Sequence, residues 1–307
     1  MKVRIQKPNP PFLATKSSAE NCVWQIVGLP YDATSSYRRG SRFAPREIRI
    51  ASDSIETYSP YRKQDLEHLN VHDAGDLRLE GCTPEAAVAV IADYYYKQTQ
   101  QGKRLLGIGG EHSVTNGALQ GLVQAGLKPF VLHLDAHLDL RESYTGGAFS
   151  HASVARRMAE LVGAERLIQW GMRSGEAAEF QWALDNGTYW GRDFTDLQSA
   201  CQRLRDEPVY ITLDLDVFDP AEFPSVGNPE PGGMTFSEFC TFLQEISQQL
   251  YMGNWMGEFR PPHQDIVLLN VVGMDVVEYS PLWDAGGRSA IFAAEIIREL
   301  LLTVVHH

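Results

Sequence analysis

The sequence has few cysteines and fewer basic than acidic residues. Four cysteines occur in 307 residues, widely separated and without a C-x-x-C pair: Cys22, Cys82, Cys201 and Cys240. This pattern argues against a disulfide framework or a thiolate zinc site, and it predicts reduced cysteines in a cytoplasmic protein. Lys and Arg number 27 against 39 Asp and Glu, for a net charge of −12. Such a charge argues against nucleic acid or an anionic membrane as the partner.

Long apolar runs are also missing. No segment reaches the roughly 18 consecutive apolar residues of a membrane-spanning helix, and the first residues lack the apolar core of a signal peptide. We find no repeat, low-complexity tract or linker-like change in composition. The sequence therefore predicts one domain over residues 1–307, with residues 1–22 as an N-terminal extension. His306 and His307 resemble the remnant of a tag and are left out of the reasoning.

Short apolar runs alternate with longer stretches of helical periodicity. The strand-like runs are residues 24–29, 104–108, 130–134, 166–170, 209–213 and 271–274. The helical stretches include residues 84–98, 235–246 and 290–302. Nearly continuous apolar strands that alternate with helices are typical of a parallel sheet covered on both faces. The predicted fold class is α/β, a single three-layer α/β/α domain with a mostly parallel central sheet.

Polar clusters follow four of these strand-like runs. They are G-G-E-H-S with His112, D-A-H-L-D with Asp135, His137 and Asp139, D-L-D-V-F-D-P with Asp214 and Asp216, and D-V-V-E-Y-S-P with Glu278. Ligands of open α/β sheets bind beyond the carboxyl ends of the strands. Residues spaced two apart on an extended chain also point to the same side. We therefore expect these side chains to converge.

Converging carboxylates point to metal. Several Asp side chains placed together repel one another and would take up protons unless cations neutralise them. Six candidate ligands are too many for one ion but suit two ions bridged by carboxylates: His112, Asp135, His137, Asp139, Asp214 and Asp216. An oxygen-rich set with two imidazoles and no thiolate favours Mn²⁺ over zinc.

D-A-H-L-D is moderately specific when taken alone, and the other signals are weak. A single D-x-D after a strand is common, and G-I-G-G-E-H does not match the dinucleotide-binding pattern G-x-G-x-x-G. His133 lies within a strand-like run, so we predict a hydrogen-bonded core histidine rather than a ligand. The joint occurrence of the clusters at strand ends is what favours a binuclear site.

The chain resembles the ureohydrolase (arginase/agmatinase) family, and within it the agmatinases most. The resemblance rests on the segments 30–49, 55–60, 109–113, 135–139, 150–157, 214–220, 229–233 and 274–281, and it extends from about Val27 to Leu302. It implies an arginase-like fold and hydrolysis of a guanidino compound to urea and an amine. Agmatine, which would yield putrescine for polyamine biosynthesis, is the leading substrate. A homo-oligomer, trimer or hexamer, is also implied.

The resemblance also implies residue roles. One Mn²⁺ would be held by His112, Asp135, Asp139 and Asp214, and a second by His137, Asp135, Asp214 and Asp216, with Asp135 and Asp214 bridging. Glu278 would accept two parallel N–H bonds from the guanidinium. His151 would pass a proton to the leaving amine or contact the substrate, although a structural role is an alternative. The catalytic residues are then His151, Glu278 and the ligand Asp139.

The chain departs from the family pattern at a few positions. The segment S-V-G-N-P has Ser225 and Asn228 where relatives commonly show G-x-G-T-P, and Arg288 replaces an apolar residue or Thr. If these side chains lie beside the substrate tail, the preferred guanidino compound differs. Guanidinobutyrate, guanidinopropionate, arginine and guanidine therefore stay open as substrates, with Arg38, Arg39, Arg141 or Arg288 as possible donors to a carboxylate tail. Trp283 is predicted to be a buried aromatic residue rather than part of the pocket.

Two other classes of protein were considered. I-T-L-D-L-D-V resembles the D-x-D nucleophile of haloacid dehalogenase-type phosphatases, but this interpretation leaves D-A-H-L-D, G-G-E-H-S and Glu278 unexplained. A non-catalytic, metal-binding relative would be expected to lose His151 or Glu278, and both are present. The sequence favours the hydrolase over both.

Overall fold

A nine-stranded sheet forms the centre of the molecule among the residues that the computed structural model describes, namely 3–16, 18–145, 147–191, 199–200, 202–204, 206–251 and 270–305. In spatial order its strands are β1 (Ile5–Gln6), β5 (Val71–Leu77), β2 (Trp24–Gly28), β6 (Arg104–Ile108), β11 (Asn270–Val277), β10 (Pro208–Asp214), β7 (Phe130–Leu134), β8 (Leu167–Trp170) and β9 (Tyr189–Gly191). Only the edge pair β1–β5 of this sheet is antiparallel. The predicted mostly parallel sheet is confirmed.

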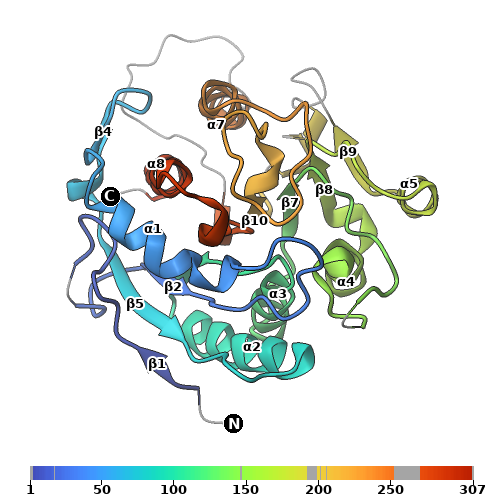
Figure 1. Cartoon of the computed structure of the whole chain (residues 1–307), viewed down its shortest axis with the longest axis horizontal. Coiled ribbons are helices and arrows are strands. Elements are labelled where there is room, and N and C mark those ends of the chain that lie inside the picture. The colour runs from blue at the N-terminus through green and yellow to red at the C-terminus, as the bar shows by residue number, and fades with distance from the viewer. Residues whose placement is uncertain are drawn as a thin grey trace.

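Helices cover both faces of the sheet (Figure 1). The first face packs against α1 (Ala44–Ser52), α7 (Phe236–Tyr251) and α8 (Arg288–Val304). The second packs against α2 (Pro84–Gln100), α3 (Val114–Gln124), α4 (Val154–Val162) and α5 (Ala177–Asn186). The remaining elements are a small hairpin, β3 (Tyr58–Ser59) with β4 (Gln64–Asp65), and the 3₁₀ turns η1 (Ser41–Phe43), η2 (Leu66–His68), η3 (His151–Ser153), η4 (Ala164–Arg166), η5 (Leu215–Val217) and η7 (Pro281–Trp283).

The ends of the longer helices follow local sequence signals. Thr83 begins α2 by accepting a hydrogen bond from the Ala86 amide, and Pro84 occupies the first helical position, where its missing N–H costs nothing. Glu176 and Glu179 form a reciprocal capping box at the start of α5. Each of the six predicted strands and three predicted helices is present. The sequence analysis did not predict β5, whose residues alternate between buried and half-buried side chains and include Gly75.

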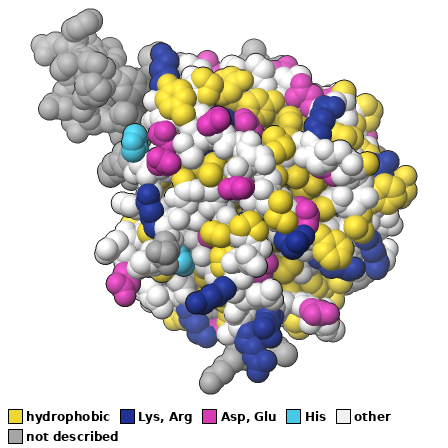
Figure 2. Space-filling model, turned by 60° about the vertical axis from the view of Figure 1, so that its left-hand side comes forward, with side chains coloured by type: hydrophobic (Ala, Val, Ile, Leu, Met, Phe, Trp, Pro, Cys, Tyr) yellow, Lys and Arg dark blue, Asp and Glu magenta, His cyan; other side chains and the backbone are white. Residues whose placement is uncertain are grey.

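Burial divides the apolar side chains into two cores, one on each face of the sheet. The N-terminal segment belongs to this packing, because Phe12 is buried in the core beside α1 and α8. Cys22, Cys82 and Cys240 are free thiols, while Cys201, His306 and His307 lie outside the described residues. Acidic and basic side chains are interspersed on the face seen in Figure 2. Within the described ranges, no helix is long and apolar enough to cross a membrane.

The strand order determines where polar side chains can meet. The four strands that precede the polar clusters, β6, β11, β10 and β7, are immediate neighbours at the centre of the sheet. All three pairs run parallel, so their carboxyl ends lie at the same edge. The sheet therefore brings four segments to one place, including His112 and Glu278, which are 166 residues apart in sequence.

Candidate active site

Two site residues, in the segments that follow β7 and β11, have an unusual backbone conformation. Asp139 and Glu278 have φ angles of 51° and 68°, a left-handed region that non-glycine residues rarely adopt. The Asp139 carbonyl accepts a hydrogen bond from the Arg156 amide at 3.2 Å, and the Glu278 amide donates to the Gly110 carbonyl at 2.9 Å. Such conformations persist only where surrounding contacts hold them, and they are often found at functional sites.

The first half of the cluster surrounds His112. Its Nδ1 lies 3.1 Å from Oδ2 of Asp135, 3.1 Å from Oδ2 of Asp214 and 3.8 Å from Oδ2 of Asp139. His112 and all three aspartates are buried. One imidazole nitrogen and three carboxylate oxygens therefore face a common point.

The second half surrounds His137, whose side chain is 21% exposed. Its Nδ1 lies 2.9 Å from Oδ2 of Asp216 and 3.5 Å from Oδ1 of Asp135. Its Nε2 lies 3.6 Å from Oε1 of Glu230, which accepts the Ser174 hydroxyl at 2.9 Å. Asp135 is shared between the two halves, as a bridging carboxylate would be.

Backbone amides orient three of these carboxylates. Oδ1 of Asp135 accepts the His137 amide at 2.6 Å, Oδ1 of Asp214 accepts the Asp216 amide at 2.8 Å, and Oδ1 of Asp216 accepts the Ala136 amide at 3.0 Å. Oδ2 of each of the three approaches an imidazole, and Oδ1 of Asp135 also lies 3.5 Å from Nδ1 of His137. Because the motif residues are spaced two apart, the backbone amide of His137 orients the carboxylate of Asp135, and that of Asp216 orients the carboxylate of Asp214.

Hydrogen bonding at His112 fits a divalent cation. Nε2 lies 2.9 Å from the Thr212 hydroxyl, and that hydroxyl donates to Oδ1 of Asp275 at 2.6 Å. The hydroxyl proton is thereby used, so Nε2 must be the protonated nitrogen and Nδ1 carries the lone pair. The buried Nδ1 has no hydrogen-bond partner. A lone pair 3.1 Å from two carboxylate oxygens is repulsive unless a proton or cation lies among them, and a cation fits the whole donor set.

The titration of the carboxyl groups agrees with this conclusion. Burial, together with the neighbouring carboxylates, raises the pKa of Asp139, Asp214 and Asp216. At Asp135 burial acts in the same direction, but the nearby imidazoles of His112, His133 and His137 outweigh it and lower the pKa. Groups with a raised pKa hold protons near neutrality, and cation binding displaces such protons.

His133 is hydrogen-bonded on both sides of its ring and is completely buried, as predicted. The Gln169 amide nitrogen donates to the Leu138 carbonyl at 2.9 Å and lies 3.2 Å from Nδ1 of His133. Nδ1 therefore accepts, and Nε2 donates to Oδ2 of Asp135 at 2.8 Å. His133 orients Asp135 and has no lone pair left for a cation.

Glu278 faces the same edge of the sheet. Its Oε1 accepts the His112 amide at 2.7 Å, and a Cβ atom added at Gly227 would lie 3.1 Å from its Oε2. Glycine at position 227 therefore leaves room beside the carboxylate. Burial, reinforced by the charge of Glu111, raises the pKa of Glu278 to about 8.

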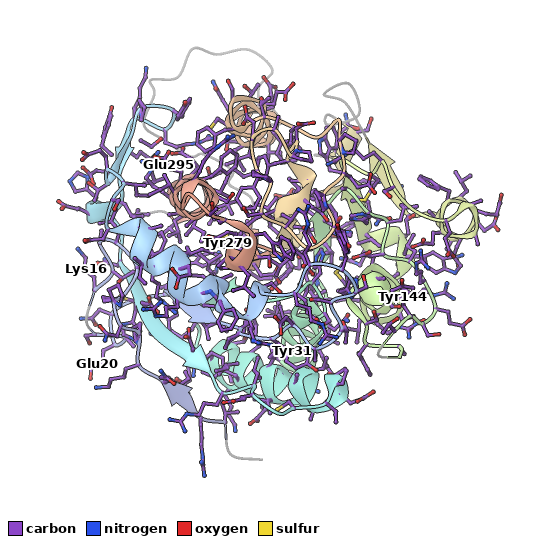
Figure 3. The ribbon with its side chains drawn as sticks, in the orientation of Figure 1. Lys16, Glu20, Tyr31, Tyr144, Tyr279 and Glu295 are labelled. Carbon is purple, nitrogen blue, oxygen red and sulfur yellow. The ribbon has the colours of Figure 1, made fainter. Side chains whose placement is uncertain are left out.

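A cavity of about 350 Å³ opens above these groups. Its walls include His137, Asp139, His151, Asp214, Asp216 and Glu278, together with Ser36, Arg141, Tyr144, Glu176, Glu179, Asn228 and Glu230. Tyr144, labelled in Figure 3, extends from the loop before α4 and lies with its ring edge-on to His151, 6.1 Å between centroids. The structure thus brings together all eight residues that the sequence singled out. His112 and Asp135 are not part of the cavity lining but lie next to Asp214 and His137, which are.

The departures from the family pattern have different locations. Asn228 lines the cavity, whereas Ser225 is buried and donates to the Trp283 carbonyl at 3.1 Å. Arg288 lies away from the cavity lining and donates to the carbonyls of Ala221 and Glu222. The prediction that Trp283 is buried is wrong. Its side chain is 52% exposed, because it covers the outside of the loop at Arg38, 5.0 Å from that guanidinium.

Sequence reasoning missed several supporting residues. Glu111 and Thr34 lie behind His151, Asp275 behind His112, and Arg173 donates to backbone carbonyls on both sides of the site, including those of Asp216 and Glu230. Two of them were within quoted motifs, since Glu111 precedes His112 and Asp275 precedes the V-V-E segment. Their partners are distant in sequence, so no local pattern announced their roles.

A parallel α/β/α domain with carboxylates and imidazoles gathered beyond adjacent strands is the arrangement of a ureohydrolase-type hydrolase. Comparison with known proteins identifies the family. The profile of the Arginase family matches residues 23–303, and the chain belongs to that family. It is 36% identical over 296 residues to an agmatinase of Bacillus subtilis, covering 96% of each chain. It is 37% identical over 233 residues to an N(1)-aminopropylagmatine ureohydrolase of Thermococcus kodakarensis, covering 73% of this chain and 77% of that one.

Solved structures agree with this assignment. A crystal structure described as a putative agmatinase from Clostridium difficile superposes with a TM-score of 0.83 at 36% identity, covering 94% of this chain and 98% of the other. The arginase-like fold and the amidinohydrolase class predicted from the sequence are thereby confirmed. The family fold implies a binuclear metal site, and the His and Asp side chains described above are suited to hold it.

Proposed function

We propose that the protein hydrolyses agmatine to putrescine and urea with two Mn²⁺ ions per chain. His112, Asp135, Asp139 and Asp214 would hold one ion, and His137, Asp216 and the bridging Asp135 and Asp214 the other. The distances around His112 and His137 support two halves that share Asp135. When bound, such a pair of ions makes a shared water acidic enough to act as a nucleophile near neutral pH.

The protein's own groups would orient the substrate. Glu278 accepts two N–H groups of the guanidinium and holds its plane for attack by water on the central carbon. The bond from that carbon to the tail nitrogen then breaks, His151 delivers a proton to the departing amine, and urea remains. The observation that carries this proposal is the convergence of the six metal-ligand candidates and Glu278 beneath one cavity.

The charges at the cavity mouth support an amine tail. Arg141 is the one Arg or Lys among the described side chains that line the cavity, and its charge is already compensated. It contacts Glu176 at 2.7 Å and Glu179 at 3.7 Å, and its guanidinium lies 4.7 Å from the Tyr144 ring centroid. Glu230 adds a further carboxylate. The mouth is therefore acidic, which favours a cationic amine and disfavours the carboxylate of guanidinobutyrate, guanidinopropionate or arginine.

Urea release across a panel of guanidino compounds tests the proposal. Purified protein with saturating Mn²⁺ is assayed with agmatine, N(1)-aminopropylagmatine, guanidinobutyrate, guanidinopropionate, arginine and guanidine, and metal content is measured separately. We expect two metal ions per chain and the highest kcat/KM with an amine-tailed compound. A large preference for a carboxylate tail would overturn the substrate assignment, and phosphate release from an aryl phosphate without urea release would favour the phosphatase alternative.

The remaining expectations belong to the same proposal. The chain would act as a single catalytic domain with residues 1–22 as an extension, in a cytoplasmic homo-oligomer, trimer or hexamer. The start of the matching profile at residue 23 supports the division after residue 22. The molar mass in solution and the residual activity of a variant that lacks residues 1–22 test them.

A further inference from the structure

A chain of hydrogen bonds reaches His151 from behind the cavity. It starts at Glu111, which is completely buried and accepts five hydrogen bonds. The amides of Thr34 and Ser35 donate to Oε2, while the hydroxyls of Thr34 and Ser113 donate to Oε1 at 2.6 Å each. A group that receives this many donors is an ionised carboxylate, which can only accept.

The next link is the Thr34 hydroxyl. Its single proton points to Glu111, so its oxygen can only accept from other neighbours. Two groups of His151 lie within reach of that oxygen, the backbone amide at 3.0 Å and ring Nδ1 at 3.3 Å. The amide donates. Nδ1 must donate as well if it is to be a partner of this oxygen, because the Thr34 proton is already used. The Ser150 hydroxyl lies 3.4 Å from Nδ1 and can accept from the same N–H.

The other ring nitrogen is on the cavity side. Nε2 of His151 lies 3.3 Å from the Ser36 hydroxyl, and Ser36 and His151 both line the cavity. Burial, which disfavours the charged form of the ring, lowers the pKa of His151 to about 4. The ring is therefore neutral at physiological pH and carries one proton, whose position determines which nitrogen can act as a base.

We propose that Glu111 and Thr34 are positioning residues that keep the neutral His151 ring protonated on Nδ1, so that Nε2 presents its lone pair to the cavity. The consequence of this tautomer for catalysis is the order of proton transfers, and this consequence rests on the proposed function. Nε2 must first accept a proton from the nucleophilic water and can only then deliver it to the departing amine. Its geometric content, the tautomer, does not depend on which substrate the protein uses.

The loop that carries Thr34 begins near Tyr31, which is labelled in Figure 3. Tyr31 is joined to Glu111 through the backbone, since its carbonyl accepts the Glu111 amide at 2.7 Å. The loop therefore has a backbone attachment that does not involve the Thr34 hydroxyl. Substitutions at Thr34 can then change the hydrogen bond to His151 while the loop remains attached to the sheet edge.

The test reads the tautomer directly by ¹⁵N NMR of histidine-labelled protein loaded with diamagnetic Mg²⁺, with the His151 signals identified by their loss in His151→Asn. We expect Nδ1 to be protonated in the unmodified protein. Thr34→Val removes the acceptor, so the proton should move wholly or partly to Nε2. With Mn²⁺, kcat should fall about 10- to 100-fold, a part of what general acid–base catalysis contributes, with little change in KM.

Three further variants make the test specific. In Glu111→Gln, the backbone amides of Thr34 and Ser35 still need an acceptor, so the side-chain oxygen should take the position of Oε2. The NH₂ group of the Gln side chain then faces Thr34. This NH₂ group would donate to the oxygen of the Thr34 hydroxyl. The Thr34 hydroxyl proton would then be free to point to Nδ1 of His151, so the same tautomer change is expected. Thr34→Ser keeps the hydroxyl and should retain the original tautomer. Ser35→Ala is the matched control, because it removes a 3.2 Å hydroxyl contact to the same carboxylate but none to His151.

The outcomes separate this inference from the proposed function. Protonation of Nε2 in the unmodified protein would overturn the inference even if urea is produced. It would also fail if Thr34→Val loses activity with the tautomer unchanged, or if Ser35→Ala behaves like Thr34→Val. An Nδ1-protonated ring in a protein that releases no urea from any guanidino compound would instead leave the tautomer assignment standing and overturn the proposed function. Metal content should stay the same in all four variants.

Discussion

The backbone amide of His112 donates to Oε1 of Glu278 at 2.7 Å, which ties the first metal-ligand candidate to the carboxylate that would bind the guanidinium. The contact uses the main chain of His112 and leaves the ring free to face Asp135 and Asp214. Glu278 is thus held at a fixed position relative to the metal cluster without belonging to it. This separation of roles can be tested by substitution.

Glu278→Gln should keep both metal ions and lose activity. The amide oxygen can still accept the His112 amide, but the negative charge facing the guanidinium is gone. Two charge-assisted hydrogen bonds of about 1.5–3 kcal/mol each correspond to a fall in kcat/KM of roughly 10²- to 10⁴-fold. Asp214→Asn is the contrasting variant and should lose metal and activity together. Metal analysis decides the matter, because a metal-free Gln variant would contradict the separation.

Gly227→Ala should reduce activity without unfolding the protein. The added methyl group would lie 3.1 Å from Oε2 of Glu278 and displace that carboxylate by a few tenths of an ångström. A small misplacement of a positioning group is expected to cost about 10-fold or more in kcat/KM. Gly286→Ala is the control, since its methyl group would meet no atom within 4 Å. Equal kinetics for the two variants would show that the position of Glu278 is not limiting.

Asn228 and Arg288 should differ in their effect on substrate binding. Asn228 lines the cavity, so removal of its amide in Asn228→Ala should raise KM about 2- to 12-fold, the range for a neutral hydrogen bond of about 0.5–1.5 kcal/mol. Arg288→Ala should leave KM unchanged, because its guanidinium donates to the Ala221 and Glu222 carbonyls. Steady-state kinetics with agmatine compares them. A shift in KM for the Arg288 variant alone would reverse this assignment.

Glu230→Gln should weaken the binding of an amine-tailed substrate more than that of free guanidine. The Ser174 hydroxyl holds the Glu230 carboxylate at the cavity wall, where it can attract a cationic tail. We expect KM for agmatine to rise about 1.5- to 5-fold, in line with a partly exposed ionic contact, while guanidine kinetics change little. Glu207→Gln serves as the control, since Glu207 pairs with Arg166 outside the cavity lining. An equal loss for both substrates would indicate that Glu230 acts through His137 instead.

Activity should rise with pH from about 6 to about 8–9. Glu278 must be ionised to bind the guanidinium, and its pKa of about 8 means that the protonated form prevails below that pH until bound cations lower it. Protons also compete with metal at His112 and His137, whose pKa values are raised because nearby carboxylates outweigh burial. His151 is neutral throughout this range. A kcat/KM profile at saturating Mn²⁺ with its optimum at pH 5–6 would contradict the mechanism.

The sequence analysis predicted the sheet well where strands are buried on both faces. β6 and β7 coincide with the predicted runs 104–108 and 130–134, because nearly continuous apolar residues identify such strands locally. The strand β5 was missed because its half-buried residues carry no continuous apolar signal. The exposed Trp283 was misjudged for a related reason. An aromatic residue is usually buried, and only the path of the loop at Arg38 leaves this one outside.

The sequence by itself determined the chemistry available at each strand end, since ligand types and two-residue spacing are local properties of the chain. The order β6-β11-β10-β7 was decided by tertiary structure, and with it the meeting of His112, Asp135, Asp214 and Glu278. Likewise, no local pattern shows that Glu111, 77 residues from Thr34, orients His151 through it. Hydrogen bonds of this kind join groups that become neighbours only when the sheet has formed, so their partners can be recognised only in the folded chain.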